Sequence, residues 1–169
     1  PYCLRTDVDE IWINKGIELF GGGNNSILIH TGQTVNYEAD GILEETLVHE
    51  ASHTSLDATH AFSSGWLEAQ TLDGGFISDY AEEFPDREDI AESFLMWLAV
   101  RYRTDKISTQ DQNLITSAIS NRLAYFDGIN CNLSPFLVDD DDEVVLIIEG
   151  DSEIKIRIFP NPTKNHINI

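Results

Sequence analysis

The sequence predicts an α+β fold that is mostly helical, with a small β-sheet near the N-terminus. Two short runs at 8–14 and 26–30 are rich in apolar and β-branched residues and have the length of strands. Apolar residues at helical spacing predict helices over 41–57, 86–103 and 108–126. With 169 residues, 41% of them hydrophobic, the chain is long enough to bury a core of its own.

The segments between these elements predict turns and one shorter helix. Residues 21–25, Gly-Gly-Gly-Asn-Asn, have the composition of a turn or flexible loop. The stretch 31–40 is polar, and Asp40 is expected to cap the helix that follows it. A short helix is expected over 66–72.

The pattern His49-Glu50-Ala51-Ser52-His53 predicts a metal site. Two histidines four residues apart lie one above the other on a helix, where one divalent cation can bind both. Glu50 can then take the proton of a metal-bound water. The histidines project away from the helix's apolar side, so they are expected to face a cleft. That apolar side is formed by Leu43, Leu47, Val48 and Ala51.

Three carboxylates are candidates to complete the site. Asp57 follows His53 by four residues, and its expected role is to accept a hydrogen bond from a ligand histidine. Glu88 and Glu92 stand in the first turns of a helix that is apolar nearly all round, and burying them costs several kcal/mol without a compensating cation. Spacing alone does not choose between them. His60 is expected to be a solvated loop residue.

The charge and the cysteines restrict the partners and the compartment. Thirty acidic against ten basic residues give a net charge of −20, which disfavours binding to nucleic acid or to an anionic membrane surface. No apolar run reaches the roughly 18 residues that a membrane span requires. Cys3 and Cys131 are expected to pair if the protein is secreted.

Together with His49-Glu50-x-x-His53, two further segments resemble a known family. These are Ser78-Asp79-Tyr80-Ala81 and Glu88-Asp89-Ile90-Ala91-Glu92-Ser93-Phe94. They are similar to the gluzincin-type zinc metallopeptidases, and within these to the catalytic domain of anthrax lethal factor and its bacterial relatives. The resemblance covers roughly residues 40–103 and implies a zincin-like fold.

The resemblance implies a role for each matching residue. His49, His53 and Glu88 would bind Zn²⁺, and Glu50 would be the catalytic glutamate. Tyr80 would assist at the developing oxyanion, and Glu92 would support the ligands from behind. The expected activity is hydrolysis of peptide bonds in a peptide or protein substrate, with the strand at 27–29 as the edge that aligns it.

The C-terminal segment resembles a second family. Ile154 to Thr163, which contains Phe159-Pro160-Asn161-Pro162, is similar to the start of the sorting domain of type IX secretion substrates, found in exported Bacteroidetes proteins. The expected organisation is a metallopeptidase domain at 1–138, an acidic linker and strand at 139–153, and a truncated sorting-domain start at 154–169. Strands are expected at 144–148 and 154–159. The resemblance implies a secreted or cell-surface protein.

Two alternatives belong to other classes. In the first, Asp57 replaces Glu88 as third ligand, which would make the protein an aspartate-ligand zincin hydrolase. In the second, the chain is a non-catalytic surface binding module that keeps a zincin fold. The sequence does not indicate the oligomeric state or the substrate specificity.

Overall fold

The computed structural model describes residues 1–135, 145–146 and 156–157. This part of the chain is a mixed α+β structure with seven α-helices and a three-stranded sheet near the N-terminus, which confirms the expected α+β organisation. Leu4–Asn130 form one compact unit, and Pro1–Cys3 with the segment from Cys131 onward form another. In the described residues no helix is both long and apolar enough to cross a membrane.

The sheet has the strand order β1-β3-β2. β1 (Glu10–Asn14) and β3 (Ser26–His30) lie within the two predicted strands and run parallel to each other. β2 (Gly21–Gly23) pairs antiparallel with β3 on its other side. The predicted turn at 21–25 is therefore wrong in part, because only Asn24 and Asn25 form the turn. Their φ angles of 49° and 62° are left-handed, a conformation that asparagine tolerates better than most residues.

The glycines of β2 allow the strand to pack directly against α2 (Leu43–Leu56). A Cβ atom on Gly22 would collide with the backbone carbonyl of Glu50. Thr54 of α2 fastens the hairpin, because its Oγ1 accepts a hydrogen bond from Gly23 N–H at 3.1 Å and lies 3.1 Å from the Ser26 carbonyl. The sheet is thus held against the helix that carries both histidines.

Two helices follow the sheet where one was predicted. The polar stretch forms α1 (Thr31–Asp40), which ends at the left-handed Gly41. The prediction that Asp40 caps the next helix is wrong, because Asp40 is the last residue of α1 and α2 starts after Ile42 without a side-chain cap. α2 continues into a π-helical segment, η2 (Asp57–Ala61).

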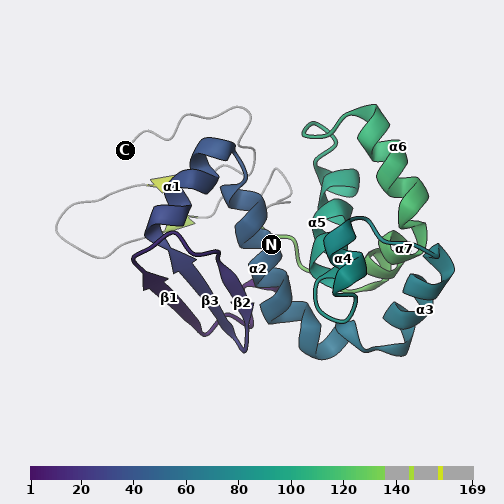
Figure 1. Cartoon of the computed structure of the whole chain (residues 1–169), viewed down its shortest axis with the longest axis horizontal. Helices are drawn as coiled ribbons and strands as arrows, with labels where there is room; N and C mark the ends of the chain where they lie inside the picture. Colours follow the sequence, from purple (N-terminus) through teal and green to yellow (C-terminus); the bar gives the residue numbers. More distant parts are fainter. Residues whose placement is uncertain (136–144, 147–155, 158–169) are drawn as a thin grey trace. The chain divides into compact units, whose positions relative to one another are not determined.

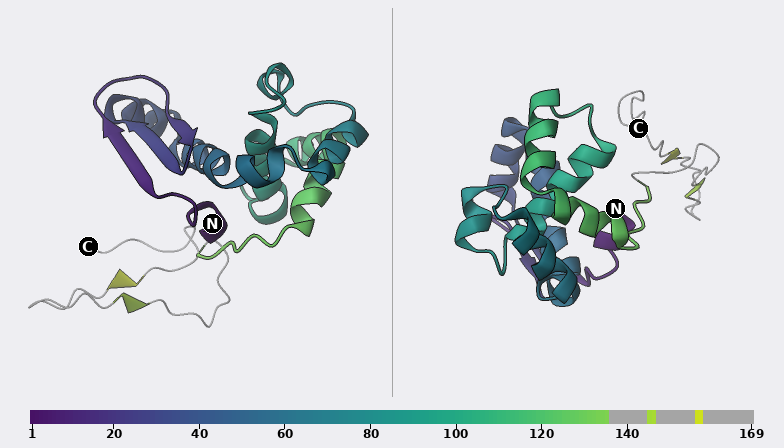
Figure 2. Two further views of the ribbon diagram at one scale, coloured as in Figure 1. Left: turned by 90° about the horizontal axis from the view of Figure 1, so that it is seen from below. Right: turned by 90° about the vertical axis from the view of Figure 1, so that its right-hand side faces the viewer.

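The remaining helices of the unit form a cluster around α5. They are α3 (Ser64–Asp73), α4 (Asp79–Glu83), α5 (Asp89–Tyr102), α6 (Thr109–Ala118) and α7 (Ser120–Gly128). α5 is buried as predicted, while the single helix predicted over 108–126 is two helices that meet at the fully buried Ile119. α2 lies between the sheet and α5, as Figure 1 and the turned views of Figure 2 show.

The chain ends form a separate unit. Cys3 and Cys131 form a disulfide, the pairing expected for a secreted chain, and Cys3 N–H donates to the Asn132 carbonyl at 3.0 Å. β4 (Val145–Leu146) and β5 (Ile156–Arg157) pair antiparallel within the two strands predicted there. The rest of the expected linker and sorting-domain start lies outside the described residues.

Replacing Gly22 by alanine is expected to lower the free energy of unfolding by about 1–3 kcal/mol, because the added methyl group must displace β2 from α2. Gly75→Ala is the matched control, since a Cβ there meets no atom within 4 Å, and it should stay within about 0.5 kcal/mol of the parent. Urea denaturation measures both. Equal midpoints for the two variants would contradict the close contact of β2 with α2.

Candidate metal and catalytic site

α2 places His49 and His53 on the same side of one helix. Their side chains are only 17% and 10% exposed, and both line a cavity of about 720 Å³. The histidines thus face a cleft, as expected from the sequence. The opposite side of α2 is less buried than expected, because Ala51 is buried while the three larger residues are only half-buried; these are Leu43, Leu47 and Val48.

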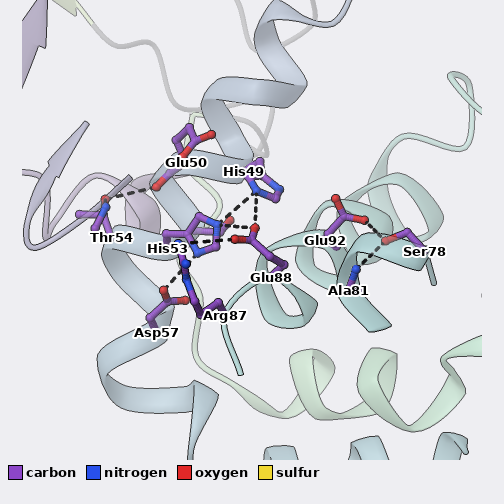
Figure 3. Close-up of polar contacts among 12 residues, drawn as sticks. His49, Glu50, His53, Thr54, Asp57, Ser78, Ala81, Arg87, Glu88 and Glu92 are labelled. Carbon is purple, nitrogen blue, oxygen red and sulfur yellow. Dashed lines mark hydrogen bonds and ion pairs between the residues drawn. The ribbon is translucent and has the colours of Figure 1, made fainter. Parts of the chain in front are cut away.

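Glu88 meets the two histidines from the start of α5. It is the residue directly before the helix and is 4% exposed. Its Oε2 lies 3.3 Å from His49 Nε2 and 3.2 Å from His53 Nε2, and the two Nε2 atoms are 3.2 Å apart. Figure 3 shows the three side chains pointing toward one another. This cluster could hold a metal ion.

The geometry of the three donor atoms suits zinc. Zinc takes imidazole nitrogen and carboxylate oxygen at roughly 2.0–2.1 Å in a tetrahedron, whose ligand atoms are then about 3.3–3.4 Å apart. The three measured separations of 3.2–3.3 Å are close to that edge length. Two imidazoles and one carboxylate also suit iron(II), so the donor set by itself does not determine the metal.

The other two candidate carboxylates lie elsewhere. Asp57 Oδ2 is 3.1 Å from His53 Nδ1, the nitrogen on the far side of the ring from the cluster. A carboxylate in that position orients the imidazole and makes it a better electron donor. Glu92 Oε2 accepts a hydrogen bond of 2.5 Å from the Ser78 hydroxyl. Of the three carboxylates, Glu88 is the one brought to both Nε2 atoms.

The cluster shifts the pKa values of its own members. Burial lowers the pKa of His53, but hydrogen bonds to Asp57 and Glu88 outweigh burial and raise this pKa to about 9. Burial favours the neutral form of Glu88, yet hydrogen bonds from His49 and His53 hold its pKa well below the usual range. Glu88 is therefore an anion, and it supplies the negative charge that a divalent cation needs.

Glu50 lines the same cavity one residue after His49. Burial raises the pKa of its carboxyl group, although the positive charges of His49 and His53 and the backbone amide of Gly22 lower it. A glutamate whose pKa lies above its usual value is a stronger base than an exposed one, which suits it to accept a proton from water.

Tyr80 reaches the cavity from α4 and is 48% exposed. Its pKa is raised by burial and by the neighbouring Glu88 carboxylate, so the phenol stays protonated and can donate a hydrogen bond. Ser78 begins α4 by accepting a hydrogen bond from Ala81 N–H at 3.0 Å, while its own hydroxyl donates to Glu92 (Figure 3). Glu92 thereby connects α5 to the short helix that carries Tyr80.

A buried ion-pair cluster holds the start of α5. Arg122 and Asp89 are both 0% exposed, and Arg122 Nε donates to Asp89 Oδ2 at 2.9 Å. Arg122 Nη1 also donates to Asp73 Oδ2 at 3.0 Å, and Gln70 Nε2 donates to Asp89 Oδ2 at 2.7 Å. Because Asp89 directly follows Glu88, these contacts help to hold the Glu88 backbone in place.

Several supporting residues were not predicted from the sequence. Gly22 was assigned to a turn, and neither Thr54 nor Arg122 was singled out. An arginine among the apolar positions of α7 was the available indication of a buried ion pair. His60 was expected to be a solvated loop residue, but it lies in η2 with its Nδ1 2.7 Å from the Tyr125 hydroxyl.

Comparisons with protein-family models, with curated proteins and with solved structures found no match to this chain. The expected membership of the gluzincins therefore stays a prediction. The case for a function depends on the geometry of the site.

Replacing Glu88 by alanine is expected to weaken zinc binding by more than about a hundredfold, since one of the donor atoms is lost. Asp57→Ala should weaken it by about 10–100-fold, the effect of removing a hydrogen-bond acceptor behind a ligand. Glu92→Ala, in the first turn of the helix that Glu88 precedes, is the control and should change affinity least. Competition with a chromogenic chelator measures all three, and a larger loss in Asp57→Ala than in Glu88→Ala would support aspartate as third ligand.

Replacing Arg122 by methionine is expected to lower the free energy of unfolding by about 3–5 kcal/mol, because two carboxylates remain buried without their cation. Arg101→Met removes the partly exposed ion pair with Asp127 and should cost less than about 1 kcal/mol. Urea denaturation of both variants gives the comparison. Similar losses would show that the buried cluster is not what holds α5.

Proposed function

We propose that this chain is a zinc-dependent metallopeptidase with a zincin-like fold. The observation that carries the proposal is the meeting of His49 Nε2, His53 Nε2 and Glu88 Oε2 at 3.2–3.3 Å in the wall of a cavity. Catalytic zinc sites commonly have three protein ligands and leave one position for water or substrate. The position of α2, between a small sheet and the helix that Glu88 precedes, supports the same class.

The mechanism assigns a separate task to each side chain. Zinc held by His49, His53 and Glu88 would supply a Lewis acid that lowers the pKa of water and polarises a carbonyl group. Glu50 accepts the proton of the attacking water and returns it to the leaving amine. Tyr80 donates a hydrogen bond to the oxygen of the attacked carbonyl, where negative charge develops.

An extended peptide is the substrate that the cavity wall favours. β3 is the central strand of the sheet, so the expectation that residues 27–29 form the edge is wrong. The edge beside the site is β2, whose three glycines line the cavity together with His49, Glu50 and His53. Because β2 carries no side chains of its own, a peptide would approach its backbone closely and pair with it as an added strand, which would carry the scissile bond past Glu50.

Export of the protein is part of the same proposal. The Phe159-Pro160-Asn161-Pro162 motif supports secretion by the type IX route to the medium or the cell surface. The Cys3–Cys131 disulfide is compatible with an oxidising compartment.

Replacing Glu50 by glutamine is expected to leave zinc binding intact and to lower peptide hydrolysis by about 10²–10⁴-fold, because the amide cannot accept the proton of water. Glu45→Gln, at an exposed position of the same helix, is the control and should retain full activity. The assay uses a quenched fluorescent peptide library with and without chelator, beside elemental analysis of protein purified without added metal.

The possible outcomes distinguish the proposal from its alternatives. Undiminished hydrolysis by Glu50→Gln would refute the mechanism. A parent protein that contains zinc but cleaves no peptide of the library would favour the non-catalytic binding module. A protein that contains iron in place of zinc would overturn the peptidase assignment itself.

A further inference from the structure

β1 is an edge strand whose side chains are exposed along its whole length. All five residues of the strand are exposed, and for Ile11, Trp12 and Ile13 the exposed fractions are 58%, 57% and 67%. In the described part of the sheet, β1 pairs with β3 alone. Soluble proteins usually protect such edges with proline, bulges or charged side chains, because an open edge binds further strands. Three consecutive large apolar residues give β1 no such protection.

The backbone of β1 determines which residues an added strand would bond. The Asp9 and Glu10 amides both donate to the Asn25 carbonyl, at 2.8 and 3.2 Å, on the β3 side, so the regular alternation of backbone groups begins at Glu10. Backbone groups alternate in direction along a strand, so those of Trp12 and Asn14 also point to β3, while those of Ile11 and Ile13 point to the free edge. A partner strand must therefore form its hydrogen bonds with Ile11 and Ile13.

We propose that β1 pairs antiparallel with β1 of a second copy of this chain, around a two-fold axis at Trp12. Ile11 then lies opposite Ile13 of the second copy, and the two exchange both of their free backbone hydrogen bonds. Trp12 lies opposite Trp12, and Glu10 lies opposite Asn14. Just outside the paired residues, Asp9 precedes β1 and Lys15 lies in the bend that follows it, so the exposed Asp9 of one copy is closest to the exposed Lys15 of the other.

Charge complementarity selects this register and a second copy as partner. Moving the strands by two residues would place either Asp9 opposite Ile13 or Lys15 opposite Ile11, and moving them by one would mismatch the backbone groups. Basic residues are scarce in this chain, ten against thirty acidic ones, and one of these few lysines meets the aspartate of an identical strand. Opposite charges facing each other stabilise a strand pair, and like charges destabilise it.

The strand pair alone is a small interface, so the dimer is expected to dissociate on dilution. Two copies of net charge −20 also repel each other at long range. At about 0.15 M salt this repulsion is screened beyond roughly 8 Å, whereas the paired strands are in direct contact. Sedimentation equilibrium at this ionic strength, over a range of protein concentrations, is therefore the measurement.

The test uses two charge reversals. Asp9→Lys puts two lysines at each end of the strand pair, and Lys15→Asp puts two aspartates there, so each variant alone should dimerise at least tenfold more weakly than the parent. An equimolar mixture of the two variants should dimerise like the parent, because each lysine then faces an aspartate. The double variant Asp9→Lys/Lys15→Asp should also dimerise like the parent. Lys106→Asp makes the same change of net charge as Lys15→Asp, at an exposed position away from β1, and should not alter dimerisation.

A parent protein that is monomeric at every concentration would overturn the proposal, whether the edge is then open or covered by another segment of the chain. Association that the single reversals do not weaken would overturn it as well. So would a mixture that associates no better than its two components.

Discussion

The contact between the Glu88 carboxylate and the imidazoles of His49 and His53 is the interaction on which the structure of the site depends. A buried carboxylate costs several kcal/mol unless cations or hydrogen-bond donors compensate it. Here two imidazole nitrogens at 3.2 and 3.3 Å supply the compensation, and they join the start of α5 to the middle of α2. The same three atoms form the donor set of the proposed metal centre, so the packing of these helices and the binding of a cation favour the same arrangement.

Layers of polar contacts hold these side chains in place. Asp57 acts on the far nitrogen of His53, and the buried Arg122–Asp89 pair holds the residue next to Glu88. On the sheet side, Thr54 and Gly22 bring the hairpin against the backbone of Glu50. A site of this kind needs its first contacts held to within about half an ångström, which explains why so many buried polar groups surround it.

The two edges of the sheet differ in character and in proposed use. β2 is made of glycine, lines the cavity and offers only backbone to a substrate. β1, at the other edge, offers isoleucine and tryptophan side chains with matching charges at its ends. Because β3 separates the two strands, pairing of β1 with a second copy leaves β2 and the cavity accessible. Catalysis and self-association would then not compete for the same surface.

The sequence by itself determined the features that depend on local spacing. These are the pair His49 and His53 on one helical face, the strands β1 and β3, and the buried character of α5. The first follows from 3.6 residues per helical turn, and the other two follow from local runs of apolar and β-branched residues. Only the tertiary structure decided which carboxylate meets the histidines, because Asp57, Glu88 and Glu92 are all plausible from spacing alone. His53 and Glu88 are 35 residues apart, and their contact results from the packing of α2 on α5, which no local pattern encodes. The glycines of β2 have no strand-like sequence pattern, so their assignment to a strand also depended on the tertiary structure, in which Gly22 packs against the Glu50 backbone.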